Sequence, residues 1–252
     1  MMISKYSANG NDFVIFHALE KKDRSALAKE LCNRQNGIGA DGLIVLIPHT
    51  INDFEWEFYN SDGSYADMCG NGSRACAHYA YINDIAGKKM NFLTGAGVIN
   101  AEVKKAHGKK KAMVLSELTV PDILDETIEF NNSTWWLINT GVPHLVKFVD
   151  DISTFDIGEA RELRNKYNAN VNIAFVDENK NLKVRTYERG VEDETLACGT
   201  GMAACFYRAF KEGKVNEKIE VYPRSGETLY LGYNGETITF KGEVVNTFNT
   251  VW

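Results

Sequence analysis

The sequence has no long apolar run. None of its segments reaches the roughly 18–20 apolar residues that a helix needs to span a bilayer. The first stretch, MMISKYSANGNDF, also lacks the apolar core of a signal peptide. We therefore expect a cytoplasmic protein that has no membrane as a partner.

Cysteine is scarce and does not occur in CxxC pairs. The chain has five cysteines, an odd number, which does not favour a framework of disulfides. Without an export signal, free thiols in reducing cytosol are the expectation.

Basic residues are outnumbered by acidic ones. The chain has 28 Lys and Arg against 34 Asp and Glu, which gives a net charge of −6, and it has no basic stripe. The one basic run, Lys104–Lys111, contains a glycine and lies between two strand-like segments. It is therefore more typical of a hairpin tip than of an anion site. Nucleic acid is not expected as a partner.

One motif, in contrast, occurs twice. CGNGSRACAHYAY (Cys69–Tyr81) and CGTGMAACFYRAF (Cys198–Phe210) align without a gap, with six identical positions among thirteen and an offset of 129 residues. Each copy begins with Cys-Gly-x-Gly and continues as a small, apolar, Ala-rich segment that predicts a helix. The repeat indicates two duplicated halves, each with a cysteine where a helix begins.

A cysteine at the start of a helix has unusual chemistry. The first backbone N–H groups of a helix have no acceptor within the helix, and the helix dipole adds about half a positive charge at that end. Both effects favour a thiolate over a thiol. The same N–H groups can hold a carboxylate.

The rest of each half repeats the same order of predicted elements. We predict an α+β fold of two pseudo-symmetric domains of like topology, with a cleft between them. The boundary is placed near Pro121, where VPDILDET interrupts the strand pattern. Three pairs of positions align between the halves at offsets of 129 to 131 residues: Gly10 with Gly141, Asp41 with Asn172, and Phe58 with Tyr187.

Two opposed thiols predict a class of reaction. A thiolate can remove the proton from a carbon next to a carboxylate while helix N–H groups stabilise the developing enolate. A protonated thiol on the other face then returns a proton, which inverts the configuration. Cys69 and Cys198 thus predict a two-base racemase or epimerase that needs no pyridoxal cofactor or metal. The two thiols would titrate as a coupled pair.

Other positions have two interpretations on sequence alone. Asn11 is either a turn residue or a side chain presented at a strand end. His144 is either a satisfied structural histidine or a group that sets the protonation state of a thiol. Glu188 and Arg189 are either a surface ion pair or a pair that holds the carboxylate and the ammonium of an amino acid.

The chain resembles the diaminopimelate epimerase family, the cofactor-independent isomerases of lysine and peptidoglycan-precursor synthesis. The motifs that carry the resemblance run nearly end to end and are very specific when taken jointly. They are GNDF (Gly10–Phe13), NGIGADG (Asn36–Gly42), YNSDGS (Tyr59–Ser64), MCGNGSRAC (Met68–Cys76), TGVPH (Thr140–His144), VNIAF (Val171–Phe175), ERG (Glu188–Gly190) and ETLACGTG (Glu194–Gly201).

The resemblance implies that Cys69 and Cys198 are the acid/base thiols and that His144 and Glu188 tune them. It implies LL- and meso-2,6-diaminopimelate as substrates and a homodimer. It also implies that each domain is a curved mixed or antiparallel sheet around a central helix. The implied domains are residues 1–117, joined by the last strand near 240–252, and residues 118–239. The residues implied to bind the substrate are Asn11, Asn60, Gly70, Asn71, Asn172, Glu188, Arg189, Gly199 and Thr200.

Three positions differ from some members of the family. Val142 stands where some members have Asn, which removes one polar contact to the distant end of the substrate. Gly42 stands where some have Gln. The loop Glu188–Cys198 is one residue longer than the shorter family form.

Three alternative classes are proline and hydroxyproline racemases, zinc-binding proteins and proteins with a phosphate-binding loop. Proline and hydroxyproline racemases also use two cysteines, but they typically show Met-Cys-Gly-His where this chain has MCGNG. A zinc site is disfavoured because cysteines seven residues apart lie about 10 Å apart along a helix, too far for metal bonds near 2.3 Å. A phosphate-binding loop would need Lys-Ser/Thr after CGTG. Core positions are expected for Cys32, Cys76 and Cys205.

Overall fold

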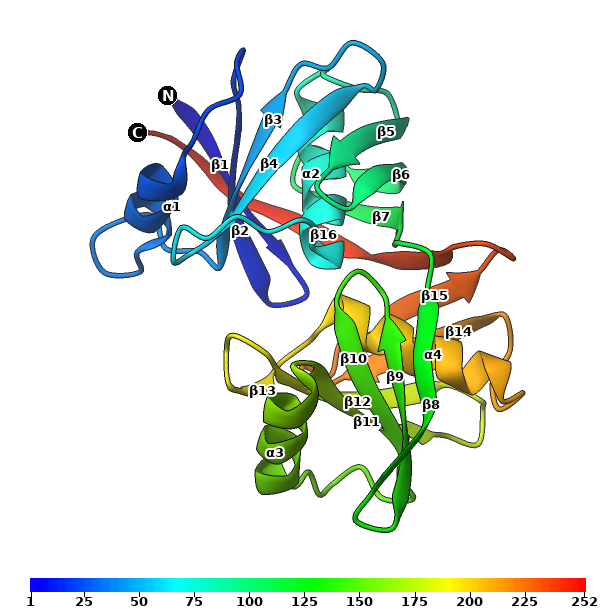
Figure 1. Ribbon diagram of the computed structural model, residues 1–252. Coiled ribbons are helices and arrows are strands. Elements are labelled where there is room, and N and C mark those ends of the chain that lie inside the picture. Colours follow the sequence, from blue (N-terminus) through cyan, green and yellow to red (C-terminus); the bar gives the residue numbers. More distant parts are fainter. The chain divides into compact units, whose positions relative to one another are not determined.

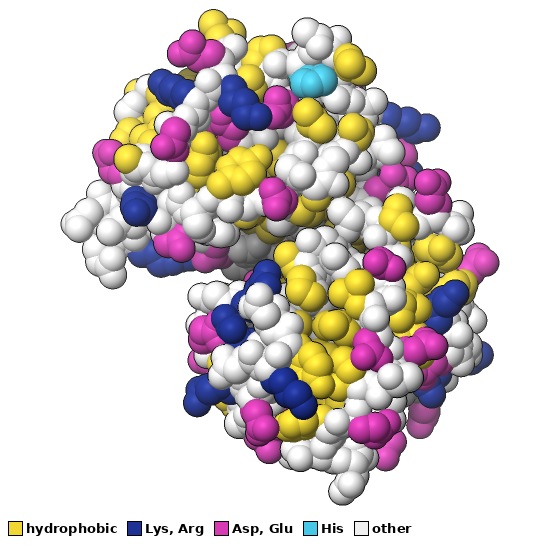
Figure 2. Space-filling model, viewed as in Figure 1, with side chains coloured by type: hydrophobic (Ala, Val, Ile, Leu, Met, Phe, Trp, Pro, Cys, Tyr) yellow, Lys and Arg dark blue, Asp and Glu magenta, His cyan; other side chains and the backbone are white.

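The computed structural model describes residues 1–252, and these form two compact units (Figure 1). Unit 1 comprises Met1–Glu117 and Lys241–Trp252, and unit 2 comprises Leu118–Phe240. Each unit combines a mostly antiparallel sheet with two helices, so the predicted α+β class is confirmed. On the face drawn in Figure 2, acidic and basic side chains are interspersed.

Unit 1 is a ring of strands around a helix. The strands pair in the order β1-β2-β3-β4-β5-β6-β7-β16, and β16 also pairs with β1, which closes the ring. The central helix is α2 (Gly70–Ile82), whose residues are all buried as far as Ala80. Helix α1 (Ser25–Cys32) packs against β2, β3 and β4. The strands are β1 (Met2–Ala8), β2 (Asn11–His17), β3 (Gly42–Ile47), β4 (Phe54–Asn60), β5 (Lys89–Thr94), β6 (Gly97–His107), β7 (Lys111–Glu117) and β16 (Ile238–Val251).

The turn between β1 and β2 shows how local sequence sets this arrangement. The two strands are antiparallel, with Ala8 opposite Asn11. Asn9 and Gly10 between them have φ values of 58° and 80°. Such a two-residue turn needs positive φ at both positions, and Asn-Gly adopts it most readily. The turn confirms the predicted break and places Asn11 at the first position of β2.

Unit 2 repeats the plan with different connections. Its strands pair in the order β15-β14-β12-β11-β10-β9-β8, and β13 pairs with β12. Helix α4 (Gly199–Lys211) packs against β9 to β12 and β15, and α3 (Ile157–Tyr167) packs against β11 and β12. The strands are β8 (Asp122–Phe130), β9 (Ser133–Asn139), β10 (Pro143–Phe148), β11 (Asn170–Val176), β12 (Leu182–Glu188), β13 (Asp193–Thr195), β14 (Lys218–Pro223) and β15 (Leu229–Tyr233).

The strand registers and the contacts of the two central helices together define which residues of the two units are equivalent. Gly72 of α2 faces Ile44, and Gly201 of α4 faces Asn172. In unit 1, Ile44 of β3 lies opposite Phe58 of β4. In unit 2, Asn172 of β11 lies opposite Thr186 of β12. The neighbouring parallel pairs, β2 with β3 and β10 with β11, give the same correspondence. The equivalent pairs beneath the two central helices are Phe13 with His144, Ile44 with Asn172, and Phe58 with Thr186.

Two of the alignments expected from the repeat are therefore wrong. Phe58 packs in the core cluster that contains α2, whereas Tyr187 lies in the cluster that contains α3, on the other face of its sheet. Asp41 precedes β3 and is not the counterpart of Asn172, which lies inside β11. The loops that connect the strands differ in length between the units. The difference in residue number between equivalent positions therefore changes along the chain, while the alternation of inward and outward side chains in each strand is preserved.

The strand pattern is interrupted at Pro121, between β7 and β8, but the interruption expected over Val120–Thr127 is wrong beyond that point. Strand β8 begins at Asp122 and pairs with β9, but its register shifts between Ile123 and Asp125 and again between Asp125 and Ile128. These irregularities remove the regular alternation that would reveal a strand in the sequence.

The cysteines predicted to be core residues are confirmed as such. Cys76 and Cys205 lie on the buried sides of α2 and α4, and Cys32 ends α1 against its sheet. All five cysteines are free thiols.

Candidate functional site

Cys69 is the N-cap of α2, as the repeat predicts. Its backbone is extended (φ −148°, ψ 113°), and the helix begins at Gly70. The Sγ atom accepts a hydrogen bond from the N–H of Gly72 at 3.3 Å. The sulfur therefore serves one of the N–H groups that the first helical turn leaves without an intrahelical acceptor. The side chain is half-buried.

Asn11 presents its carbonyl oxygen to this sulfur. The Asn11 Oδ1 lies 3.7 Å from the Cys69 Sγ, and it accepts a hydrogen bond from the Asn71 side chain at 3.4 Å. The Asn11 Nδ2 donates to the Asp41 carboxylate at 2.7 Å. The structure thus brings Asn11, Cys69 and Asn71 together, and it places Asn11 at a strand end, as the side-chain interpretation predicts.

Cys198 is the N-cap residue of α4, but its side chain makes no capping hydrogen bond to the first turn of the helix. Its backbone is extended (φ −119°, ψ 110°), and the helix begins at Gly199. The Sγ atom lies 3.5 Å from the hydroxyl oxygen of Thr200. Cys198 is 8% exposed. Its sulfur therefore has a side-chain hydroxyl as a neighbour, where the Cys69 sulfur has an amide oxygen.

His144 lies on β10 beneath α4 and is completely buried. Its Nε2 is 2.9 Å from the Thr200 hydroxyl, and its Nδ1 is 3.1 Å from the Asn172 Nδ2. Burial lowers the pKa of His144 to about 3, and the positive charge of Arg189 acts in the same direction. The imidazole is therefore neutral at physiological pH, and it reaches the Cys198 thiol through Thr200.

Asn172 lies directly behind His144, also completely buried. Its Nδ2 donates to the carbonyl oxygen of Leu145 at 2.9 Å, and its Oδ1 accepts from the Thr186 hydroxyl at 2.8 Å. Sequence reasoning missed Thr186. The signal that could have found it is the alternation of side chains along β12, because this alternation points Thr186 towards α4, the helix that Cys198 precedes.

The remaining predicted residues lie at strand ends. Asn60 ends β4, and its Nδ2 donates to the Ser64 hydroxyl at 3.0 Å. Glu188 ends β12. The backbone N–H of Arg189 donates to the Asn170 side chain, and its guanidinium donates to the Asn168 carbonyl at 2.8 Å. Asn170 is a second residue that the sequence did not single out.

The glycines after each cysteine keep the helix starts open. Gly70 and Asn71 begin α2, and Gly199 and Thr200 begin α4. Their N–H groups belong to the first helical turn, which favours anions. At Gly201, a Cβ would lie 2.4 Å from the Asn172 Oδ1, so only glycine allows the helix to approach β11 this closely.

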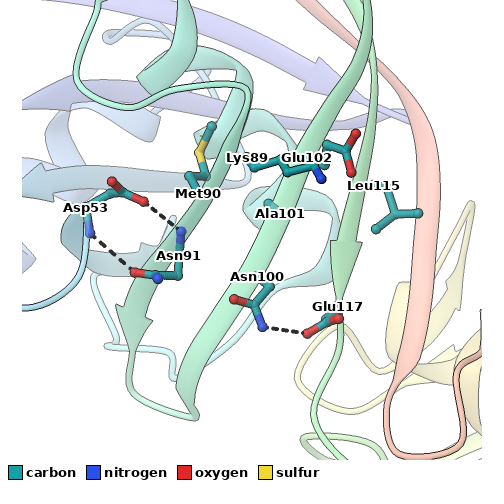
Figure 3. A pocket seen from close by; sticks show the side chains of 9 residues that line it. All are labelled: Asp53, Lys89, Met90, Asn91, Asn100, Ala101, Glu102, Leu115 and Glu117. Atoms are coloured by element: carbon teal, nitrogen blue, oxygen red, sulfur yellow. Dashed lines mark hydrogen bonds between the residues drawn. The ribbon is translucent and has the colours of Figure 1, made fainter.

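A surface hollow of about 370 Å³ lies elsewhere in unit 1, on the outer side of β5, β6 and β7 (Figure 3). Asn91 and Asn100 line it and are hydrogen-bonded to Asp53 and Glu117, respectively. None of the predicted site residues lines this hollow, and its open polar wall has no group of the kind that the two cysteines provide. No group of three or more His, Cys, Asp or Glu side chains is placed to hold a metal ion.

Comparison with known proteins decides the family. The sequence model described as Diaminopimelate epimerase matches residues 3–119 and 136–244. The chain belongs to the diaminopimelate epimerase family. Proteins described as Diaminopimelate epimerase from a Nitratiruptor species and from Helicobacter pylori are 62% and 44% identical to it. These alignments cover 99% and 97% of this chain and 98% and 93% of the two relatives.

Solved structures share the fold of this diaminopimelate epimerase family member at much lower identity. A probable proline racemase from Agrobacterium radiobacter superposes with a TM-score of 0.80 at 13% identity, over 100% of this chain and 92% of that one. A PhzF-family phenazine biosynthesis protein from Bacillus anthracis gives 0.73 at 15%, over 99% and 98%. These likenesses establish the architecture alone. No helix in the structure is both long enough and apolar enough to cross a membrane.

Proposed function

We propose that this chain interconverts LL- and meso-2,6-diaminopimelate by a two-base mechanism. The observation that carries the proposal is the presence of a cysteine as the N-cap of each central helix, in a chain 62% identical to a relative described as Diaminopimelate epimerase. A cysteine is an uncommon N-cap, and its repetition in both units calls for a chemical reason.

The reaction assigns one proton transfer to each sulfur. One of Cys69 and Cys198 is a thiolate that takes the α-proton and becomes a thiol. The other is a thiol that gives its proton to the opposite face of the same carbon and becomes a thiolate. The product has the inverted configuration, and the two sulfurs have exchanged protonation states.

The helix starts stabilise the charge that develops on the substrate. In this proposal the N–H groups of Gly70, Asn71, Gly199 and Thr200 bind the carboxylate next to the reacting carbon. When the α-proton leaves, negative charge moves onto the carboxylate oxygens. The attraction between these oxygens and the fixed N–H dipoles at the two helix N-termini is therefore stronger in the transition state than in the bound substrate.

The distant end of the substrate needs groups of both charges. We assign its carboxylate to Arg189 and its ammonium to Glu188, with Asn11 and Asn60 as further polar contacts. Asn172 was expected to bind substrate as well. Its amide group is buried and bonded to His144, Leu145 and Thr186, so we assign it to the support of His144 instead.

The setting follows from this reaction. We propose a cytoplasmic enzyme of lysine and peptidoglycan-precursor synthesis that acts as a homodimer. Size measurement in solution by light scattering tests the dimer, and a mass equal to a single chain would contradict it.

The experiment that tests the function is turnover in heavy water. The purified protein is incubated with LL- or meso-diaminopimelate, and the α-hydrogen is followed by mass analysis. We expect epimerisation with uptake of one deuterium at the inverted carbon, and no reaction with proline. Cys69→Ala and Cys198→Ala should each abolish turnover, while Cys32→Ala, which changes a core thiol on α1, should retain it. Turnover by either of the first two variants at a normal rate would contradict the two-base mechanism.

A further inference from the structure

The layers beneath the two central helices differ in chemistry although they are equivalent in position. Beneath α2 the three equivalent residues are Phe13, Ile44 and Phe58, which belong to one hydrophobic core cluster. Beneath α4 they are His144, Asn172 and Thr186, which are linked by hydrogen bonds. Burying three polar side chains costs free energy unless each is satisfied, so this departure from the duplicated plan points to a task that unit 2 alone performs.

The hydrogen bonds beneath α4 have a fixed direction. The Asn172 Oδ1 accepts from Thr186 and its Nδ2 donates to the Leu145 carbonyl, which settles the orientation of the amide. The amide therefore presents N–H to the His144 Nδ1, which must accept. A neutral imidazole then carries its proton on Nε2 and donates it to the Thr200 oxygen. The Thr200 hydroxyl keeps its own hydrogen for the Cys198 sulfur.

The polar neighbour of Cys69 has the opposite direction. The Nδ2 of Asn11 donates to Asp41. Its Oδ1 accepts a hydrogen bond from the Asn71 Nδ2. The orientation of the Asn71 amide is fixed because its oxygen accepts a hydrogen bond from Arg74. An amide oxygen therefore faces the Cys69 sulfur, and an amide oxygen can only accept. A thiol satisfies both of its neighbours, since it donates to Asn11 and accepts from the Gly72 N–H.

We propose that in the substrate-free protein Cys198 is the thiolate and Cys69 carries the proton, with Thr200 as the residue that positions a hydroxyl hydrogen on Cys198. His144 and Asn172 act through Thr200 by holding that hydroxyl in the donor direction. The inference rests on the proposed function and extends it: Cys198 is the base for the epimer whose α-hydrogen faces it, and Cys69 is the acid. The other epimer reacts when the two sulfurs have the opposite protonation states.

Charged and titratable groups surround both sulfurs. On the Cys198 side, Arg189 acts on His144, Glu188 ends β12, and the buried Cys205 thiol lies close enough to Cys198 to interact with it. On the Cys69 side, Asp41 holds Asn11, and Arg74 donates to Asn71 and to the Gly70 carbonyl. Both cysteines are the N-cap residue of a helix, so the dipole favours a thiolate at each of them. The two sulfurs differ in their side-chain neighbours, because Thr200 donates a hydrogen bond to Cys198 whereas Asn11 accepts one from Cys69.

The test is the rate of alkylation by iodoacetamide as a function of pH, measured separately for each cysteine by peptide mass analysis of the whole, substrate-free protein. Only a thiolate reacts. We expect the alkylation rate of Cys198 to reach half of its maximum at a lower pH than the rate of Cys69 does, and we call this pH the midpoint. Thr200→Val removes the hydroxyl at nearly constant volume, and it should raise the Cys198 midpoint by about one to two pH units, the effect of one hydrogen bond to a charged group. Thr200→Ser keeps the hydroxyl and should restore the wild-type profile of Cys198.

Asn11→Ala provides a second variant at the other sulfur. It removes the acceptor from Cys69 and should lower the Cys69 midpoint while that of Cys198 stays in place. A lower midpoint for Cys69 in the wild type, or a Thr200→Val profile equal to that of the wild type, overturns the inference. Turnover of diaminopimelate is assayed on the same preparations. A wild-type protein with the predicted alkylation order and no turnover would sink the proposed function and leave the assignment of the thiolate intact.

Discussion

Asn172 occupies in unit 2 the place that Ile44 occupies in unit 1. Asn172 lies on β11 and Ile44 on β3, and each faces the glycine three residues after the N-cap cysteine of its unit. A Cβ on Gly201 would meet the Asn172 Oδ1, and a Cβ on Gly72 would meet the Ile44 Cδ1. The same backbone plan thus supports a polar, directional contact in one unit and an apolar, adaptable contact in the other.

This difference predicts unequal effects of alanine at the two glycines. In Gly201→Ala the new methyl group would lie 2.4 Å from an amide oxygen that three hydrogen-bonding partners of Asn172 hold in place. In Gly72→Ala the nearest atom, at 3.2 Å, is the terminal methyl of Ile44, which can rotate. We expect Gly201→Ala to lower the free energy of unfolding by about 1–3 kcal/mol, and Gly72→Ala by less. Urea denaturation of both variants measures this, and equal losses would contradict it.

His144 predicts a loss of stability in acid. Its pKa is about 3 in the folded protein, below the value of about 6.5 expected when unfolded. As pH falls from 6.5 towards 3, the unfolded chain binds a proton that the folded chain does not, so the contribution of His144 is complete above pH 6.5 and declines below it. Between pH 7 and pH 5 the loss from this group is about 2 kcal/mol.

His144→Gln keeps an amide donor and removes the titration. Its free energy of unfolding should therefore fall less steeply between pH 7 and pH 5 than that of the wild type. Some acid sensitivity should persist, because burial also lowers the pKa of His78, in unit 1, to about 4. Parallel curves for the two proteins would show that His144 is not the group concerned.

Arg189 predicts a change in substrate affinity. Its guanidinium donates to the Asn168 carbonyl, and the proposed function gives its remaining donors to the distant carboxylate. Arg189→Ala should raise KM for diaminopimelate by roughly tenfold or more, the scale of one charge-assisted hydrogen bond, and should change kcat less. Arg224→Ala, which removes a half-exposed partner of Glu194, is the matched control and should leave KM in place. Unchanged kinetics in Arg189→Ala would remove that residue from the site.

A buried ion pair supports unit 1 away from the thiols. Arg24 and Glu57 are bonded to each other, with side chains 2% and 1% exposed. Glu57→Gln leaves the guanidinium without its counter-charge in the interior, so we expect a loss of about 3–5 kcal/mol. Lys104→Ala breaks an exposed pair with Glu102 and should cost less than about 1 kcal/mol. Thermal melting of the two variants compares them, and a similar melting temperature for both would contradict the expectation.

The sequence predicted the helix starts well and the layer beneath them poorly. Cys69 and Cys198 were expected where α2 and α4 begin, because the Cys-Gly-x-Gly repeat is local and each cap depends on a few adjacent residues. The equivalence of Phe58 and Thr186 was not found, because it depends on the register between strands, which the repeat alone does not specify. For the same reason Thr186 was missed, although it fixes the orientation of Asn172.

His144 illustrates the limit in another way. The family resemblance implied that it tunes a thiol, but the sequence has no means of showing that a hydroxyl from α4 lies between the two groups. That contact joins residues 56 positions apart in the chain. Side-chain direction at such a distance follows from tertiary packing.

Strand β16 has a consequence for the order in which the protein matures. The last segment, Lys241–Trp252, belongs to unit 1, and it pairs with β1 from Met2 opposite Val251 to Ser7 opposite Val245. A nascent chain therefore lacks one wall of its first unit until Lys241–Trp252 has been synthesised and has left the ribosome, whereas Leu118–Phe240 precedes that segment in the chain. All residues of the second unit are therefore available before the last strand of the first unit, and unit 1 is the later of the two to be completed.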